Sequence, residues 1–107
     1  MKIALGCDHR GRDALDRIKA MLQARGYEIV EFGAGSETSF DYPDAAYPTA
    51  RSVRDGEADR GILFCGSGIG MSIVANKVNG VRAALCHDEL TAEMARRHND
   101  ANVLCMP

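Results

Sequence analysis

Short apolar runs alternate along the chain with segments in which apolar residues recur every three or four positions. The first pattern is typical of buried strands and the second of amphipathic helices. Strands are predicted over residues 2–7, 27–32, 61–65, 81–86 and 103–106, and helices over residues 13–25, 44–57, 69–78 and 89–98. Strands and helices that alternate with short connections favour right-handed crossovers and a parallel sheet. We therefore expect one domain spanning residues 1–107, a Rossmann-like three-layer α/β/α sandwich around a five-stranded parallel sheet.

Two elements depart from this regular pattern. Pro48 falls inside the first turns of the second predicted helix. Because proline lacks an amide donor and crowds the preceding turn, that helix should start late or bend. The last predicted strand is followed by no helix, so one flank of it should be left uncovered.

Composition narrows the class of protein. The 107 residues are 46% hydrophobic and carry a formal net charge of -2, so the chain has no broad basic field and nucleic acid is not an expected partner. No apolar run approaches the roughly 20 residues that a membrane helix needs. The amino terminus reaches Asp8 and His9 too soon for a secretion signal. We expect a cytoplasmic protein without membrane contact.

The four cysteines, Cys7, Cys65, Cys86 and Cys105, lie far apart and form no CxxC pair. A zinc site would need ligands paired at short spacing, so no metal is expected. Each cysteine lies in or at the end of an apolar run, which is typical of reduced, buried thiols. This interpretation suffices for three of them, whereas Cys65 also has a reactive alternative.

Ligands of open parallel sheets bind beyond the carboxyl ends of the strands. The predicted strands bring acids, imidazoles and a thiol to that edge: Asp8 and His9, Asp41 and Tyr42, Cys65 and Ser67, and His87 and Asp88. A site at this edge is therefore predicted.

A glycine-rich turn, Gly66-Ser-Gly-Ile-Gly70, leads from Cys65 into the third predicted helix. The first amides of a helix have no internal partners and can bind an anion, either a phosphate or an oxyanion formed during reaction. The G-x-G-x-G spacing follows the third strand and is a weak match to a dinucleotide fingerprint, and no Walker motif is present. Such a helix terminus also favours a thiolate, which makes Cys65 a candidate general base. A purely structural glycine turn and core packing of Cys65 remain the alternatives.

His98 and Asn99 end the fourth predicted helix. That helix starts at the carboxyl edge of the sheet and runs back to the opposite edge, so both residues lie too far away to join Cys65 within one chain. They either form a helix terminus, where His and Asn are common, or serve the site of a neighbouring subunit.

Five separated motifs together resemble one family. They are Gly6-Cys-Asp-His9, Asp41-Tyr-Pro43, Gly61-Ile-Leu-Phe-Cys-Gly-Ser-Gly-Ile-Gly70, Ala75-Asn-Lys-Val78 and Arg97-His-Asn-Asp-Ala-Asn-Val103. In this order they are similar to type B ribose-5-phosphate isomerase, whose family includes allose-6-phosphate and galactose-6-phosphate isomerases.

The resemblance implies interconversion of ribose 5-phosphate and ribulose 5-phosphate through a cis-enediolate, without metal or cofactor. It implies that Cys65 moves the proton and that the Ser67 hydroxyl and the loop amides hold the enediolate, the loop being Gly66, Ser67, Gly68, Ile69 and Gly70. Asp8 and His9 match ligands of the sugar and its phosphate end, and Tyr42 matches a residue of the substrate-binding pocket. His98 matches the residue that opens the furanose ring and Asn99 one that steadies the intermediate, both supplied by the second subunit of a homodimer or larger assembly.

Two departures from the family bear on activity. Some members use a glutamate as base at the position that Met71 occupies here, so this sequence groups with the members that use a cysteine. The presence of Cys65 also favours a pentose phosphate as substrate. Family members continue into further helices whose arginines clamp the phosphate, so the chain is expected to be a C-terminally shortened form in which only Arg10, Arg12 or Arg82 can substitute. A non-catalytic sugar-phosphate-binding or dimerisation module and a hexose-6-phosphate isomerase are the alternative functions.

Overall fold

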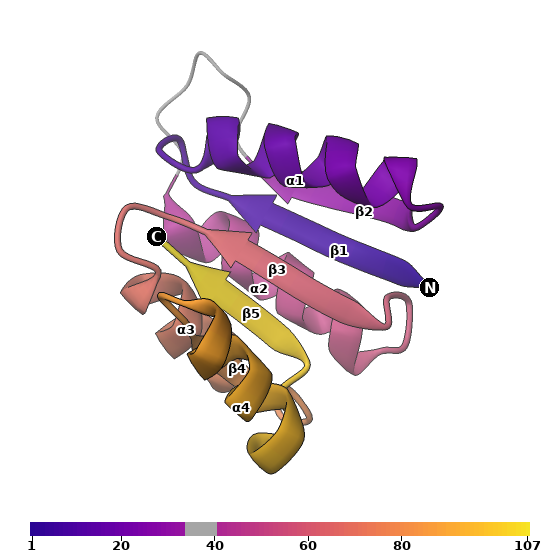
Figure 1. Ribbon diagram of the computed structural model, residues 1–107. Helices are drawn as coiled ribbons and strands as arrows, with labels where there is room; N and C mark the ends of the chain where they lie inside the picture. Colours follow the sequence, from indigo (N-terminus) through magenta and orange to yellow (C-terminus); the bar gives the residue numbers. More distant parts are fainter. Residues whose placement is uncertain (34–40) are drawn as a thin grey trace.

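Alternating strands and helices form a parallel sheet with helices on both faces (Figure 1). The computed structural model describes residues 1–33 and 41–107. The strands are β1 (Lys2–Cys7), β2 (Glu28–Gly33), β3 (Arg60–Phe64), β4 (Ala83–Leu85) and β5 (Val103–Met106). The helices are α1 (Arg12–Ala24), α2 (Tyr42–Arg54), α3 (Ile69–Asn76) and α4 (Glu89–Asn99). The predicted three-layer α/β/α fold with a five-stranded parallel sheet is confirmed.

The strand order corrects the expectation for the last strand. The order is β2-β1-β3-β5-β4, so β5 pairs with β3 on one side and β4 on the other. Both edges of β5 are therefore occupied, and Val103 and Cys105 are buried. The uncovered feature is one face of the strand, where Leu104 is only half-buried. Chain order alone could not predict that the last strand inserts between two earlier ones.

The two faces of the sheet are covered unequally (Figure 1). Helices α2 and α3 pack on one face over a large core that includes Ala50, Leu63 and Met71. On the other face, a smaller core forms under α1 around Leu5 and Leu15. Helix α4 lies on this second face and has no buried residue.

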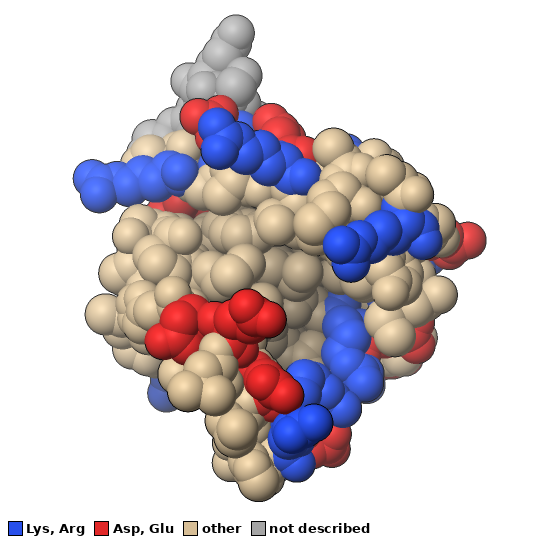
Figure 2. Space-filling model, in the orientation of Figure 1, with Lys and Arg blue, Asp and Glu red and all other residues tan. Residues whose placement is uncertain are grey.

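An apolar groove of about 270 Å³ runs along the second face of the sheet. Its lining includes Ile62 and Leu104 of the sheet and Ala92 and Ala95 of α4. Figure 2 shows this hollowed surface, mostly of uncharged residues, with charged side chains around it. None of the helices in the described part of the chain is long and apolar enough to cross a membrane.

Helix α2 begins earlier than predicted. It starts at Tyr42, two residues before the expected start, after an extended Asp41, with Pro43 in its first turn and Pro48 inside the helix. A proline in the first turn loses no intrahelical hydrogen bond. The buried face beyond it, including Ala46 and Ala50, packs on the sheet and keeps the segment helical despite Pro48. The expectation of a late start is therefore wrong, while its alternative, a bend at Pro48, stays a prediction.

Candidate active site

The thiol of Cys65 lies at the carboxyl end of β3, inside the turn that leads to α3. The backbone N–H of Gly68 donates a hydrogen bond to Sγ of Cys65 at 3.0 Å. The residue is only 7% exposed, and its own amide donates to the carbonyl of Met106 in β5. Cys65 is therefore both buried and hydrogen-bonded to the glycine turn.

Gly68 occupies a position that only glycine fits. Its φ of +77° lies in the left-handed region, which side chains disfavour. A Cβ here would also lie 2.5 Å from Cδ1 of Leu85 and 3.0 Å from the carbonyl carbon of Met106. The amide that contacts the Cys65 sulfur is thus held by close packing against β4 and β5.

The ring of Tyr42 lies against the start of α3. A Cβ on Gly70 would come within 2.8–2.9 Å of three carbons of that ring. Tyr42 is the first residue of α2, and its ring stays 39% exposed. The structure therefore brings Tyr42 to the glycine turn, next to the edge where Cys65 lies.

The remaining positions of the turn are open to solvent. Gly66 and Ser67 are exposed, and Ile69 is 52% exposed. The Ser67 hydroxyl accepts a hydrogen bond from the Ile69 amide at 3.2 Å. In the part of the chain that the structure describes, the amides of Gly66 and Ser67 donate to no protein acceptor. The amide of Gly70, in the first turn of α3, has no intrahelical partner. These N–H groups are the available donors for an anion.

Asp8 shapes the neighbouring turn after β1. Its Oδ1 accepts hydrogen bonds from the amides of Arg10 at 2.9 Å and Gly11 at 3.0 Å. The side chain is 8% exposed, and its own amide donates to the carbonyl of Phe64, the residue before Cys65. A Cβ on Gly11 would lie 2.7 Å from that same carbonyl oxygen. Asp8 thus locks the β1 turn beside the β3 turn, and the sequence Asp8-His-Arg-Gly11 is itself a turn signal.

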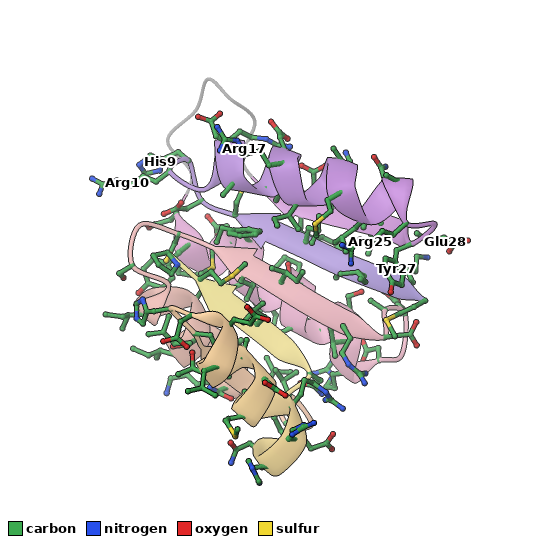
Figure 3. All side chains as sticks on the ribbon, in the orientation of Figure 1. His9, Arg10, Arg17, Arg25, Tyr27 and Glu28 are labelled. Carbon is green, nitrogen blue, oxygen red and sulfur yellow. The ribbon has the colours of Figure 1, made fainter. Side chains whose placement is uncertain are left out.

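His9 and Arg10 extend from this turn beyond the carboxyl ends of the strands (Figure 3). Both are exposed. Arg10 reaches the glycine turn: a Cβ on Gly66 would lie 3.3 Å from Cδ and 3.5 Å from Nη1 of Arg10. The first and third strands thus bring Asp8, His9, Arg10 and Cys65 to one edge, as the parallel topology predicts.

His98 and Asn99 are not part of this cluster. They form the last two residues of α4, and Nε of Arg82, just before β4, donates to the Asn99 carbonyl at 2.6 Å. The end of α4 therefore lies at the amino edge of the sheet (Figure 1). The 11 residues of α4 span about 16 Å at the rise of about 1.5 Å per residue of an α-helix. Both side chains are exposed, and the left-handed residue that caps the helix is Asp100, with φ of 51°.

The other acidic and thiol groups of this edge have structural roles. Asp88 caps α4: its Oδ1 accepts from the Thr91 amide at 2.7 Å, which holds the pKa of Asp88 below its usual range. All four cysteines are buried. Burial, followed by the nearby thiols of Cys65 and Cys86, raises the pKa of Cys105 to about 12. Cys105 is therefore a neutral core thiol. No group of three His, Cys, Asp or Glu side chains within residues 1–33 and 41–107 is placed to hold a metal ion.

Comparison with known proteins gives the same family over nearly the whole chain. Residues 3–107 match the family described as Ribose/Galactose Isomerase. Ribose-5-phosphate isomerase B of Escherichia coli is 48% identical over 103 residues, which cover 96% of this chain and 69% of that protein. The D-erythrulose-4-phosphate isomerase of Pectobacterium atrosepticum is 43% identical, covering 99% of this chain and 70% of that protein.

Solved structures agree with the sequence comparison. Ribose-5-phosphate isomerase B of Clostridium thermocellum superposes with a TM-score of 0.96 at 50% identity, covering 98% of this chain and 71% of that one. The chain thus spans about 70% of the length of these relatives.

Proposed function

The chain belongs to the ribose/galactose isomerase family, and from this premise we propose that it is an aldose–ketose isomerase that interconverts ribose 5-phosphate and ribulose 5-phosphate. The observation that carries the proposal is the hydrogen bond from the Gly68 amide to the Cys65 thiol at the mouth of the glycine turn. It joins a candidate base to a set of oxyanion donors. The choice of ribose 5-phosphate is supported by the relatives of that name, at 48% and 50% identity.

In the proposed reaction, Cys65 acts as thiolate and removes the proton from C2 of the open-chain aldose. The electron pair moves to the carbonyl oxygen at C1, and the resulting cis-enediolate carries negative charge on its oxygens. The amides of Gly66, Ser67 and Gly70, with the Ser67 hydroxyl, stabilise that charge. Cys65 then returns the proton to C1, the hydroxyl proton on O2 passes to O1, and the carbonyl forms at C2, which yields the ketose. No atom is gained or lost, because both protons stay with the substrate and the double bond shifts.

The amides also make a metal unnecessary in this proposal, because they supply the electrostatic stabilisation that a Lewis acid would otherwise give. Activity should survive prolonged dialysis against a chelator. A loss that zinc or manganese specifically restores would contradict this assignment of the glycine turn.

Cyclic ribose 5-phosphate must open before its C2 proton becomes acidic, and we propose that His98 of a second copy of the chain catalyses this step. Asn99 of the same copy then contacts the anionic intermediate. Both side chains are exposed and lie at the opposite edge of the sheet from their own Cys65. A homodimer with shared sites would bring one chain's α4 end to the other chain's glycine turn.

The direct test is an isomerisation assay on the 107-residue chain with a panel of sugar phosphates. The panel contains ribose 5-phosphate, erythrose 4-phosphate, allose 6-phosphate and galactose 6-phosphate, with Cys65→Ala as the blank. We expect the highest kcat/KM for ribose 5-phosphate. A higher value for another sugar phosphate would reassign the substrate, and no turnover above the blank for any of them would overturn the proposed function.

A further inference from the structure

The candidate site contains anion donors from the backbone, and one side chain adds a positive charge to them. We propose that Arg10 binds the phosphate group of the substrate. This inference rests on the proposed function and names a ligand for that same site. It starts from the three arginines that the sequence leaves as candidates, Arg10, Arg12 and Arg82, which the structure places in very different surroundings.

Arg12 and Arg82 are engaged elsewhere. The Arg12 guanidinium forms ion pairs with Asp16 and Glu31, and its pKa is raised by the Asp16 hydrogen bond, although burial opposes that shift. A substrate phosphate would have to compete with two carboxylates there. Arg82 donates to the Asn99 carbonyl at the amino edge of the sheet, away from the glycine turn. Neither arginine can serve the site of its own chain.

Arg10 has the opposite surroundings. Its side chain is exposed, and no carboxylate within residues 1–33 and 41–107 lies within ion-pairing distance of its guanidinium. Its backbone is fixed, because the Arg10 amide donates to the buried Asp8 carboxylate at 2.9 Å. Figure 3 shows the side chain extending from the β1 turn at the edge where ligands of parallel sheets bind.

The contact with Gly66 places the guanidinium at the glycine turn. Gly66 is not among the glycines with positive φ, so its backbone conformation does not require glycine. A Cβ on Gly66 would lie 3.3 Å from Cδ and 3.5 Å from Nη1 of Arg10, so the Arg10 side chain runs alongside the Gly66 backbone. Gly66 follows Cys65 directly, so Arg10 lies over the residue next to the proposed base. The planar guanidinium presents two parallel donors that match the oxygens of a phosphate.

The test separates binding from turnover by placing each Arg10 variant in the Cys65→Ala background. Titration calorimetry then gives Kd for ribose 5-phosphate and for inorganic phosphate without catalysis. Arg10→Met keeps most of the aliphatic stem and removes the charge, and Arg10→Lys restores a charge without the planar fork. Arg25→Ala is the matched control, because Arg25 is exposed and lies at the far end of α1 (Figure 3).

We expect Arg10→Met to raise both Kd values by about 10- to 100-fold, the loss typical of one charge-assisted hydrogen bond to phosphate. Arg10→Lys should recover part of this loss, and Arg25→Ala should leave both values unchanged. Equal Kd values for Arg10→Met and Arg25→Ala would overturn the proposal.

Steady-state kinetics of the Arg10 variants in the chain that keeps Cys65 distinguish a role in binding from a structural role. Arg10→Met should raise KM for ribose 5-phosphate and leave kcat within about threefold, since uniform binding is lost. A variant that lowers kcat with little change in KM would instead show that Arg10 only supports the glycine turn, which overturns the proposal. If the parent chain isomerises no sugar phosphate while Arg10→Met still weakens phosphate binding, the proposed function falls and the Arg10 assignment stands.

Discussion

Helices α3 and α4 both begin at the carboxyl edge of the sheet, yet they are held in contrasting ways. Helix α3 buries Met71 and Ala75 in the larger core, and the glycine turn beside Cys65 leads directly into this helix. Helix α4 has no buried residue and lies on the half-covered face. The difference teaches that the core fixes Cys65 and the glycine turn, whereas the end of α4, with His98 and Asn99, is presented to solvent.

The largest expected effect is at the fixed half of the site. Cys65→Ala should lower kcat by about 10²- to 10⁴-fold, the usual contribution of a general base, and leave the fold intact. Steady-state kinetics with ribose 5-phosphate measures this loss. Cys86→Ala is the control, because Cys86 is also buried at this edge but its thiol donates to the Ala84 carbonyl and not to the glycine turn. Wild-type kcat in Cys65→Ala would remove the base from the mechanism.

The contrast in packing should appear directly in stability. Met71→Ala should lower the free energy of unfolding by about 2–5 kcal/mol, because it opens a cavity beneath the glycine turn. Met94→Ala removes the same side chain from α4, where it is 37% exposed, and should cost about 0.5 kcal/mol or less. Urea unfolding of both variants gives the comparison. Equal losses would mean that α4 is as firmly packed as α3.

Substitution of Gly68 tests whether this position needs glycine because of close packing or only because of its left-handed backbone conformation. Gly56 and Gly68 share a φ of +77°, but a Cβ on Gly56 would meet nothing within 4 Å. Gly56→Ala should therefore cost only the left-handed conformation, about 1–2 kcal/mol. Gly68→Ala adds the collision with Leu85, for an excess of about 1–3 kcal/mol and a lower kcat. Equal losses of unfolding free energy in Gly56→Ala and Gly68→Ala would show that the glycine turn is loosely packed.

The smallest effect concerns how the second face holds its two helices. Helix α1 is tied to β2 by ion pairs of Arg12 and Lys19 with Glu31, whereas the ion pairs found for α4, Arg97 with Glu93 and Arg96 with Asp100, stay within the helix and its cap. Partial burial raises the pKa of Glu31, but hydrogen bonds from Lys19 and Arg12 outweigh it and hold the pKa below its usual range.

Because this folded-state pKa is depressed, the ion pairs of Glu31 stabilise the protein above the unfolded pKa of about 4.3 and are lost as the pH falls through the folded value. Glu31→Gln should therefore remove part of the acid-induced loss of stability, under about 1 kcal/mol for pairs this close to the surface. The free energy of unfolding, measured between pH 6 and pH 3, gives this acid-induced loss, and Glu93→Gln is the control. The same acid slope in both variants would contradict the assignment.

The order and type of the elements were predictable because apolar periodicity is a local signal. The position of β5 was not, since pairing between distant segments leaves no local trace. The early start of α2 was missed because Pro48 suggests a break, while the core contacts of Ala46 and Ala50 that override it are tertiary.

Part of the site could be predicted in the same way. Residues that directly follow strands, such as Asp8 and Cys65, reach the carboxyl edge by topology alone. The sequence could not choose among Arg10, Arg12 and Arg82, because the choice depends on which guanidinium meets an acceptor from another element, such as Glu31 for Arg12 and the Asn99 carbonyl for Arg82. The contact between Tyr42 and Gly70 likewise exists only once α2 and α3 pack together.

The central claim is that Cys65 of one chain and His98 of another complete a single site, and mixed dimers test it most directly. Cys65→Ala and His98→Ala chains, each nearly inactive alone, are refolded together in equal amounts and assayed with ribose 5-phosphate. Half of the dimers are then mixed, and each has one intact site, so the account predicts recovery of about one quarter of wild-type activity. Activity no greater than the average of the two separate variants would contradict it.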